Sequence, residues 1–369
     1  MSQQKTSLKQ ITIIGLGLIG GSLALAIKQH FPSIHITGVD KRRVLKRALE
    51  RNAIDNAESS IKRSVLNADL IFIATPISVI TRVIPVVAAH APSHAIITDT
   101  GSVKRSIMAE AGKYFPQGNF IGGHPMAGSE LSGIDAAHPL LFQNAYYILT
   151  PIKGVKKKSI QLLANFLNAL DARVYTMDAI THDSVVAAVS HLPQLAAVAL
   201  MNTVGKHHPN APRHLALSAG GFRDMTRIAS SPFDVWKDIL SSNRKEVRDA
   251  LYLYIKQLNK IAAFAGVNNS ALENQFRLSR KLRSRIPRTM KGFLIPLVEF
   301  SVFIEDKPGE LARLTTALAN EAINIKDLEL LKVREGRGGT FRLSFENRTI
   351  ALTAADVLQK EGFNISTNW

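Results

Sequence analysis

Short apolar segments alternate with helical patterns through the first half of the chain. The apolar runs predict buried strands at 11–14, 34–39, 70–74, 95–98 and 120–122. Between them, segments such as 22–27 have the spacing of a helix. Two more strands are predicted at 145–150 and 172–175, on either side of a helix around 159–170. Because strands that alternate with helices typically form a parallel sheet, we expect a doubly wound parallel sheet that ends near Asp178.

The pattern changes after Asp178. From there to about residue 291 the strand signal disappears and long helical patterns take over. One of them, 183–204, is nearly all apolar or small between its polar ends. A helix that is apolar on most faces is normally buried, and we expect a second subunit to cover this one. The segment therefore predicts an all-helical dimerisation domain and a homodimer.

A third pattern follows a linker that contains Pro287, Gly292 and Pro296. Strand patterns at 297–304, 325–333, 340–345 and 363–365 are interrupted by helical patterns at 309–322 and 351–361. This order, βαββαβ, is typical of a small ferredoxin-like domain. The three patterns together predict domains at 1–178, 179–291 and 297–369.

The composition removes several classes of function. The chain has 369 residues and no cysteine, which excludes a disulfide framework, a thiolate nucleophile and cysteine-based metal sites. The first residues lack the pattern of a signal peptide, and no run reaches the roughly 18 apolar residues of a membrane span. We therefore expect a cytoplasmic protein with no membrane partner.

The net charge of +17 raises the question of nucleic acid. The densest basic run, 277–291, carries seven Lys and Arg residues. Aromatic residues do not interleave with it and no recognition motif accompanies it, so we interpret it as a solvated helical face and predict no nucleic-acid partner. A positive field does favour the encounter with an anionic substrate.

A nucleotide-binding fingerprint follows the first predicted strand. Residues 15–20 have the sequence GLGLIG and precede a helical pattern, the order that a dinucleotide site requires. Asp40 ends the second strand, where a carboxylate can accept hydrogen bonds from ribose hydroxyls. This favours NAD, although Lys41 and the two arginines after it leave NADP open. The predicted cofactor contacts are Gly15, Gly17, Leu18, Ile19, Gly20, Asp40, Thr75 and Pro76.

His124 is the strongest candidate for a catalytic residue. It lies in the segment 122–130, GGHPMAGSE, and we expect it in a loop after the fifth strand, at the carboxyl edge of the sheet. A histidine there can accept a hydroxyl proton when a carbinol is oxidised, although it could also be a structural residue bonded to backbone. Ser102, after the fourth strand, could assist it or cap a helix from Val103. Glu130 could tune His124, contact substrate or be a surface carboxylate.

The helical segment adds two motifs, SHLPQ at 190–194 and GGFRDMTRIA at 220–229. Two arginines after a glycine pair suit an anion clamp, because guanidinium groups bind carboxylates bidentately. The alternative is a structural ion pair with Asp224. The candidate substrate contacts are Arg227, Gln194, His191, Glu130 and Gly220.

Taken together, these motifs resemble the prephenate dehydrogenase family of tyrosine biosynthesis, and residues 306–311, DKPGEL, resemble the first turn of an ACT domain. The resemblance implies NAD-dependent oxidative decarboxylation of the dianion prephenate to 4-hydroxyphenylpyruvate, without a metal. It assigns His124 to the substrate hydroxyl, Ser102 to assisting it, and Arg227 to a carboxylate. It further implies feedback by L-tyrosine at a regulatory site formed by Asp306, Pro308, Gly309 and Asn324.

Other functions stay open. Gln194 stands where some relatives have histidine, so the substrate could be arogenate, or the enzyme could be a cyclohexadienyl dehydrogenase of dual specificity. A β-hydroxyacid dehydrogenase also joins a Rossmann domain to helices, but such enzymes use a helical lysine and 183–204 contains none. A non-catalytic sensor of NAD and amino acids would not need His124, Ser102 and Arg227 together.

Overall fold

The computed structural model describes residues 6–116, 118–128, 131–206, 210–286, 297–334 and 338–367. Along the chain the structure divides into two compact units, with the boundary between Leu278 and Ser279. Each unit has its own sheet. We therefore describe the units separately.

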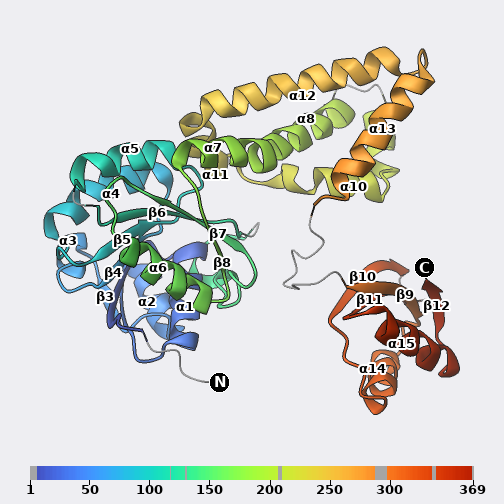
Figure 1. Cartoon of the computed structure of the whole chain (residues 1–369), viewed down its shortest axis with the longest axis horizontal. Helices are drawn as coiled ribbons and strands as arrows, with labels where there is room; N and C mark the ends of the chain where they lie inside the picture. Colours follow the sequence, from blue (N-terminus) through green and yellow to red (C-terminus); the bar gives the residue numbers. More distant parts are fainter. Residues whose placement is uncertain are drawn as a thin grey trace. The chain divides into compact units, whose positions relative to one another are not determined.

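An eight-stranded sheet with the order β3-β2-β1-β4-β5-β6-β7-β8 forms the centre of the first unit (Figure 1). Its strands are β1 (Gln10–Ile14), β2 (His35–Val39), β3 (Asn56–Glu58), β4 (Leu70–Ile73), β5 (Ile96–Asp99), β6 (Phe120–Pro125), β7 (Tyr146–Pro151) and β8 (Arg173–Thr176). The first six strands are parallel, which confirms the predicted sheet. In contrast, β7 runs antiparallel to β6, so the sheet as a whole is mixed.

Helices cover both faces of this sheet. They are α1 (Leu18–His30), α2 (Arg42–Glu50), α3 (Ile61–Ser64), α4 (Ile77–His90), α5 (Arg105–Tyr114) and α6 (Lys157–Ala169). One apolar core contains side chains of α1, α2 and α6, such as Leu23 and Phe166. A second core contains side chains of α4 and α5, such as Ile84 and Ile107. The two separate cores show that the sheet is doubly wound.

Between residues 179 and 283 the described residues form helices joined by turns and no strand, as predicted. The helices are α7 (Ala179–Val186), α8 (Leu192–Lys206), α9 (Ala211–Ala216), α10 (Gly220–Thr226), α11 (Phe233–Ser242), α12 (Arg244–Phe264) and α13 (Asn269–Arg283). A π-helical turn at Ala187–His191 joins α7 to α8. The combined helix, Ala179–Lys206, is long and apolar enough to cross a membrane by length and composition alone, and 28% of its most apolar window is buried.

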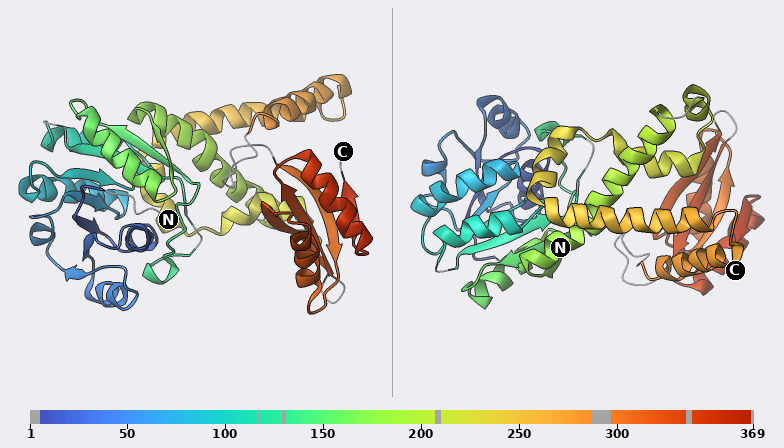
Figure 2. Two further views of the ribbon diagram at one scale, coloured as in Figure 1. Left: turned by 60° about the horizontal axis from the view of Figure 1, so that its bottom comes forward. Right: turned by 90° about the horizontal axis from the view of Figure 1, so that it is seen from above.

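The second unit has the predicted βαββαβ order, which can be followed in Figure 2. Its elements are β9 (Val298–Ile304), α14 (Glu310–Asn320), β10 (Asp327–Arg334), β11 (Gly338–Phe345), α15 (Arg348–Lys360) and β12 (Asn364–Thr367). The strands form an antiparallel sheet with the order β10-β11-β9-β12. Both helices contribute to one apolar core against the sheet, so they cover the same face.

Candidate active site

The glycine turn between β1 and α1 is tightly packed on one side and open on the other. A Cβ atom added at Gly15 would lie 2.5 Å from the carbonyl oxygen of Ala74, and one added at Gly20 would lie 1.9 Å from that of Gly15. At Gly17, by contrast, an added Cβ would meet nothing within 4 Å. No side chain caps the first turn of α1, which contains Leu18 and Ile19. Open space beside uncapped amides at a helix N-terminus suits a bound phosphate group.

Asp40 is held beside this turn. Its Oδ2 accepts a hydrogen bond of 2.7 Å from the backbone N–H of Leu16, and its Oδ1 accepts one of 2.7 Å from Lys41. At the end of β4, the hydroxyl of Thr75 is buried and has no hydrogen-bond partner within the described structure. The next residue, Pro76, precedes α4. An acid fixed at the turn and an unsatisfied hydroxyl are the features expected of a site that receives a dinucleotide.

His124 lies within β6 and pairs with Ile148 of β7, so its predicted position in a loop is wrong. The strand continues because β7 supplies an antiparallel partner as far as Pro125. The preceding glycines allow this close packing. A Cβ atom at Gly122 would lie 2.2 Å from the hydroxyl of Thr150, and one at Gly123 would lie 2.4 Å from the carbonyl oxygen of Asp99.

A buried chain of polar groups joins His124 to the helical segment. Nδ1 of His124 lies 2.8 Å from Nε2 of His182, and Nδ1 of His182 lies 2.8 Å from Oδ1 of Asp183. His124 is 9% exposed and the other two residues are at most 1% exposed. Burial is the main cause that holds the pKa of His124 well below its ordinary value, and the nearby basic groups of His182, Lys104 and His191 act in the same direction. His124 is therefore neutral at pH 7 and can accept a proton.

Asp183 also caps a helix. Its two oxygens accept hydrogen bonds from the backbone N–H groups of Lys104, at 2.7 Å, and Arg105, at 2.9 Å. Because α5 begins at Arg105, the helix predicted from Val103 starts two residues later. Ser102 lies before this start and makes no cap, so its predicted role as an N-cap is wrong. A carboxylate from α7 provides the cap instead.

A buried ion pair completes the end of the sheet. Nζ of Lys104 donates to Oδ2 of Asp99, and both side chains are fully buried. Oδ2 of Asp99 also accepts from the N–H of Gly101, and Oδ1 accepts from that of Gly123. Burial lowers the pKa of Lys104, an effect that the charge of Asp99 opposes. Asp99 thus ties β5, the segment after it and β6 together.

Neither His182 nor Asp183 belongs to a recognisable motif in the sequence. They lie in the first turns of the long apolar helix, where the only signal was that polar residues stand at its end. The contact with His124 spans 58 residues, and the one between Asp183 and Lys104 spans 79. Such distant pairs follow from the fold and not from local spacing.

Of the predicted residues in the helical segment, two are buried. His191 is 1% exposed, packs edge-on against Trp236, and has its pKa lowered to about 4 by burial. The side-chain amide of Gln194 donates a hydrogen bond of 2.9 Å to the carbonyl oxygen of Ile228. This bond fixes the short 3₁₀ turn Arg227–Ser230 that follows α10.

The remaining predicted residues of this segment are exposed or lie outside the described structure. Arg227, at the start of the 3₁₀ turn, and Gly220, at the start of α10, are both exposed. Glu130 lies outside the described residues.

The predicted regulatory residues lie in the second unit but in two places. Asp306, Pro308 and Gly309 line a cavity of about 380 Å³. Asn324 lines another cavity, of about 400 Å³, beside Lys326 and Glu346. The structure therefore groups three of the four residues and leaves Asn324 apart.

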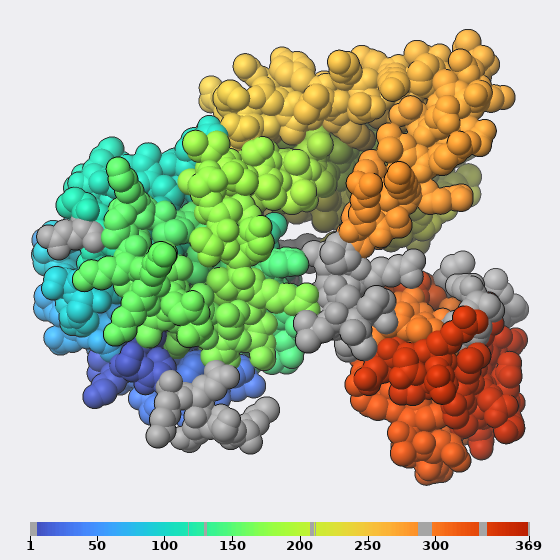
Figure 3. Space-filling view, in the orientation of Figure 1, coloured from blue at the N-terminus to red at the C-terminus, as the bar shows by residue number. Residues whose placement is uncertain are grey.

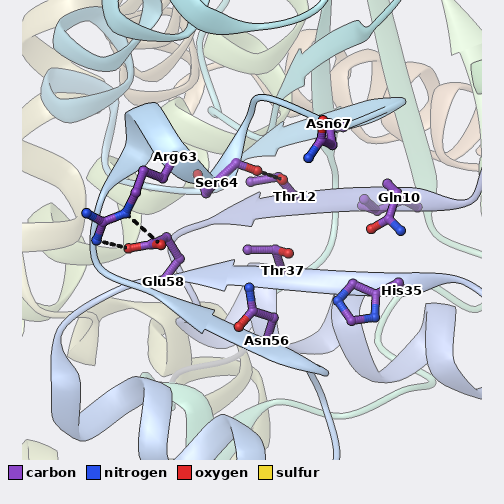
Figure 4. Close-up of a pocket in the computed structure, with 11 residues that line it drawn as sticks. Gln10, Thr12, His35, Thr37, Asn56, Glu58, Arg63, Ser64 and Asn67 are labelled. Carbon is purple, nitrogen blue, oxygen red and sulfur yellow. Dashed lines mark hydrogen bonds and ion pairs between the residues drawn. The ribbon is translucent and has the colours of Figure 1, made fainter.

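A further cavity in the first unit, of about 280 Å³, contains none of the predicted residues (Figure 4). Polar side chains of β1, β2 and β3 line it, including Thr12, Thr37 and Asn56. At one end Arg63 forms an ion pair of 2.8 Å with Glu58.

Two family models together match most of the first unit. The model described as "Prephenate dehydrogenase, nucleotide-binding domain" matches residues 23–176. The model described as "Prephenate dehydrogenase, dimerization domain" matches residues 178–282.

Individual proteins give the same result. The chain is 35% identical over 353 residues to a prephenate dehydrogenase of Bacillus subtilis, covering 94% of each chain. It is 35% identical over 281 residues to a cyclohexadienyl dehydrogenase of Zymomonas mobilis, covering 75% of this chain and 96% of that one. A crystal structure of a prephenate dehydrogenase from A. aeolicus with hydroxyphenyl propionate and NAD⁺ is 27% identical, with a TM-score of 0.70, and covers 77% of this chain and all of that one.

Proposed function

This chain belongs to the prephenate dehydrogenase family and is an NAD-dependent dehydrogenase, and we propose that it oxidises prephenate with His124 as the base. Bound NAD accepts the hydride from the carbon that carries the hydroxyl group. The neutral imidazole of His124 takes the hydroxyl proton. Carbon dioxide then leaves because the ring becomes aromatic, and 4-hydroxyphenylpyruvate remains. The observation that supports this role is the burial that keeps His124 unprotonated.

The cofactor contacts follow from the glycine turn. The open side at Gly17 leaves room for the pyrophosphate, and the first amides of α1, at Leu18 and Ile19, can donate to it. Asp40 accepts from the ribose hydroxyls. Thr75 and Pro76 complete the site at the end of β4.

For the substrate, Arg227 binds a carboxylate. Arg227 is an exposed residue at the start of the 3₁₀ turn, and a bidentate contact with a carboxylate is the strongest that a guanidinium group makes. Gln194 acts indirectly, because its amide holds the turn that carries Arg227. Gly220, His191, Glu130 and Ser102 contribute to the same substrate site.

The direct test is the production of NADH from NAD and prephenate, measured by absorbance. A parallel assay with arogenate decides between a prephenate-specific enzyme and one of dual specificity, the second candidate that the similarity to a cyclohexadienyl dehydrogenase favours. Absence of NADH with both substrates would overturn the catalytic proposal and favour a sensor of NAD and amino acids.

The helical segment forms a homodimer in this proposal. Its α12 exposes large apolar side chains, with Tyr252 62% and Leu253 67% exposed, and Figure 3 shows the outer side of this helix uncovered. Val189, on the long apolar helix, is 60% exposed. Apolar area on this scale marks a surface that another molecule covers. Analytical ultracentrifugation of the full chain should give twice the chain mass, and a Leu253→Asp variant should shift it towards the monomer.

The exposed apolar surface of the helical segment could also contact a membrane, but we favour a second subunit. We therefore propose a cytoplasmic protein. The long helix also carries Asp183 and Gln194, which are buried and bonded to other parts of the first unit. Insertion into lipid would break these bonds. Flotation with lipid vesicles tests this: the protein should stay in the dense fraction.

The last segment is proposed to be a regulatory ACT domain, in a chain with domains at 1–178, 179–291 and 297–369. The support is its βαββαβ order, together with the cavity next to Asp306, Pro308 and Gly309. L-Tyrosine, the end product, is the proposed ligand. Asn324 lines a different cavity, so its contact with the same ligand would need a second copy of the unit.

A further inference from the structure

We propose that His182 and Asp183 are positioning residues that set the tautomer of His124, so that its Nε2 carries the lone pair used as the base. This inference rests on the proposed role of His124. The positions of the protons can be assigned starting from Asp183, because an ionised carboxylate can only accept hydrogen bonds. The pKa of the Asp183 carboxyl is lowered, by hydrogen bonds from His182 and from the N–H groups of Lys104 and Arg105 that outweigh its burial. Asp183 is therefore an ionised acceptor.

The positions of the protons follow from that acceptor. Because Asp183 has no proton to give, the contact of 2.8 Å between its Oδ1 and Nδ1 of His182 requires the proton on His182. The proposal takes His182 as neutral, so its other nitrogen, Nε2, is an acceptor. The contact of 2.8 Å between this Nε2 and Nδ1 of His124 therefore has its proton on His124. A neutral His124 protonated at Nδ1 has its lone pair on Nε2.

The same chain stabilises His124 after it accepts a proton. The imidazolium donates through Nδ1 to His182, whose polarisation is supported by the charge of Asp183. Asp183 is itself fixed by the start of α5, and Nδ2 of Asn243 donates to its backbone carbonyl oxygen at 2.8 Å. A base on the sheet is thus oriented by a helix that follows it by more than fifty residues. The ring of His124 also packs edge-on against that of His182, with 5.0 Å between the ring centroids.

The variant Asp183→Asn changes the proton pattern without changing the size of the side chain. An amide whose oxygen takes the place of Oδ2 keeps the bond from Arg105, gives up the one from Lys104 and presents its NH₂ group to His182, which must then accept at Nδ1 and carry its proton on Nε2. His124 would accept at Nδ1 and carry its own proton on Nε2, the wrong place for a base. We expect kcat to fall by on the order of 10²- to 10⁴-fold, with KM for prephenate and NAD within about threefold.

Nitrogen-15 NMR of the histidine-labelled full chain measures the tautomer without reference to activity. His124 is assigned from the signals that disappear in a His124→Asn variant. In the wild-type protein at pH 8 we expect Nδ1 protonated and Nε2 unprotonated, and we expect the reverse in Asp183→Asn. If the tautomer reverses but kcat stays normal, the relay exists and His124 is not the base. If His124 is protonated on Nε2 in the wild type, the relay itself is refuted.

Two further variants guard against a merely structural effect. Asp178→Asn makes the same chemical change at the start of the same helix, where the carboxylate of Asp178 caps α7 through Ile180 and Thr181. Only its backbone carbonyl oxygen, which the substitution leaves in place, accepts from the backbone N–H of His182. It should leave kcat and the tautomer unchanged, and an equal loss of kcat would contradict the proposal. His182→Gln removes the relay but keeps the cap by Asp183. It should give signals of both tautomers, and a single Nδ1-protonated form with kcat within threefold of wild type would overturn our assignment.

Discussion

The sheet and the helices of the first unit bury their apolar residues to very different degrees. In α1, which packs on the sheet, Leu23 and Ile27 are completely buried. In α12, which is longer by eight residues, the described contacts bury only Val247. The sheet is thus covered by its own helices, whereas the helical segment leaves large apolar side chains of α12 exposed. In the proposed homodimer a second copy covers this surface, so the stability of the helical segment would depend on association, whereas that of the sheet is internal to one chain.

The proposed chemistry divides in the same way. His124, on the sheet, is buried and neutral, which suits proton transfer. Arg227, on the helical segment, is exposed and charged, which suits capture of an anion. Substitutions on the sheet should therefore change kcat, and substitutions around α10 should change KM. His182 and Asp183 are the exception, since they belong to the helical segment but act on the sheet.

The largest effect is expected from the base. His124→Asn should lower kcat by about 10²- to 10⁴-fold, because the amide of asparagine cannot accept the hydroxyl proton, and should change KM much less. Steady-state kinetics with prephenate and NAD measure both constants. The exposed residue His35 offers a control, and His35→Asn should be unchanged. A kcat within threefold of wild type would remove His124 from the mechanism.

The next largest effect is expected on substrate binding by the helical segment. Arg227→Ala should weaken prephenate binding by about 2 to 4 kcal/mol, which is a rise in KM of roughly 30- to 700-fold, since one carboxylate loses its bidentate partner. KM for NAD should stay within about twofold. Arg213→Ala, at an exposed arginine of α9 outside this motif, is the matched control and should behave as wild type. An equal rise for NAD would identify Arg227 as a structural residue.

The second unit should contribute neither to proton transfer nor to binding of the substrate carboxylate. A chain that ends at residue 292 should keep its kcat, because neither the base nor the carboxylate contact lies beyond it. The cyclohexadienyl dehydrogenase of Zymomonas mobilis agrees with this expectation, because 281 residues of this chain already cover 96% of that enzyme. In the full chain L-tyrosine should shift the apparent affinity for prephenate by roughly 5- to 150-fold, and truncation should abolish that shift. Undiminished inhibition of the truncated chain would mean competition at the active site.

The smallest effect is on stability and depends on pH. In the folded protein the pKa of His191 is lowered to about 4 from an ordinary 6.5, so between these values only the unfolded chain binds the proton. The free energy of unfolding should therefore decrease as pH falls from 6.5 to 4. Urea unfolding at pH 7.5, 6 and 4.5 measures it. His191→Gln should flatten this dependence in part, because buried His124 contributes to it as well. An equally steep dependence in the variant would show that His191 is not the source.

Local patterns were sufficient to predict most helices and strands, because apolar residues recur with a different spacing in helices than in strands. All four strands and the two helices α14 and α15 of the second unit were predicted, and so was every strand of the large sheet except β3. The strand β3 was missed because Asn56–Glu58 is short and polar, without an apolar run to reveal it. The direction of β7 could not be predicted, since an apolar strand has the same pattern whether it runs parallel or antiparallel.

The candidate site was predictable only where its residues form a continuous motif. The glycine turn, Asp40 and the segment around His124 were found in this way, and the sequence by itself determined the α/β order, the cofactor fingerprint and the identity of the candidate base. Only the tertiary structure decided that His124 lies in a strand, that Asp183 replaces Ser102 as the cap of α5, and that His182 joins the two. These contacts link residues 58 to 79 positions apart, and a local pattern contains no information about which distant side chains burial will bring together.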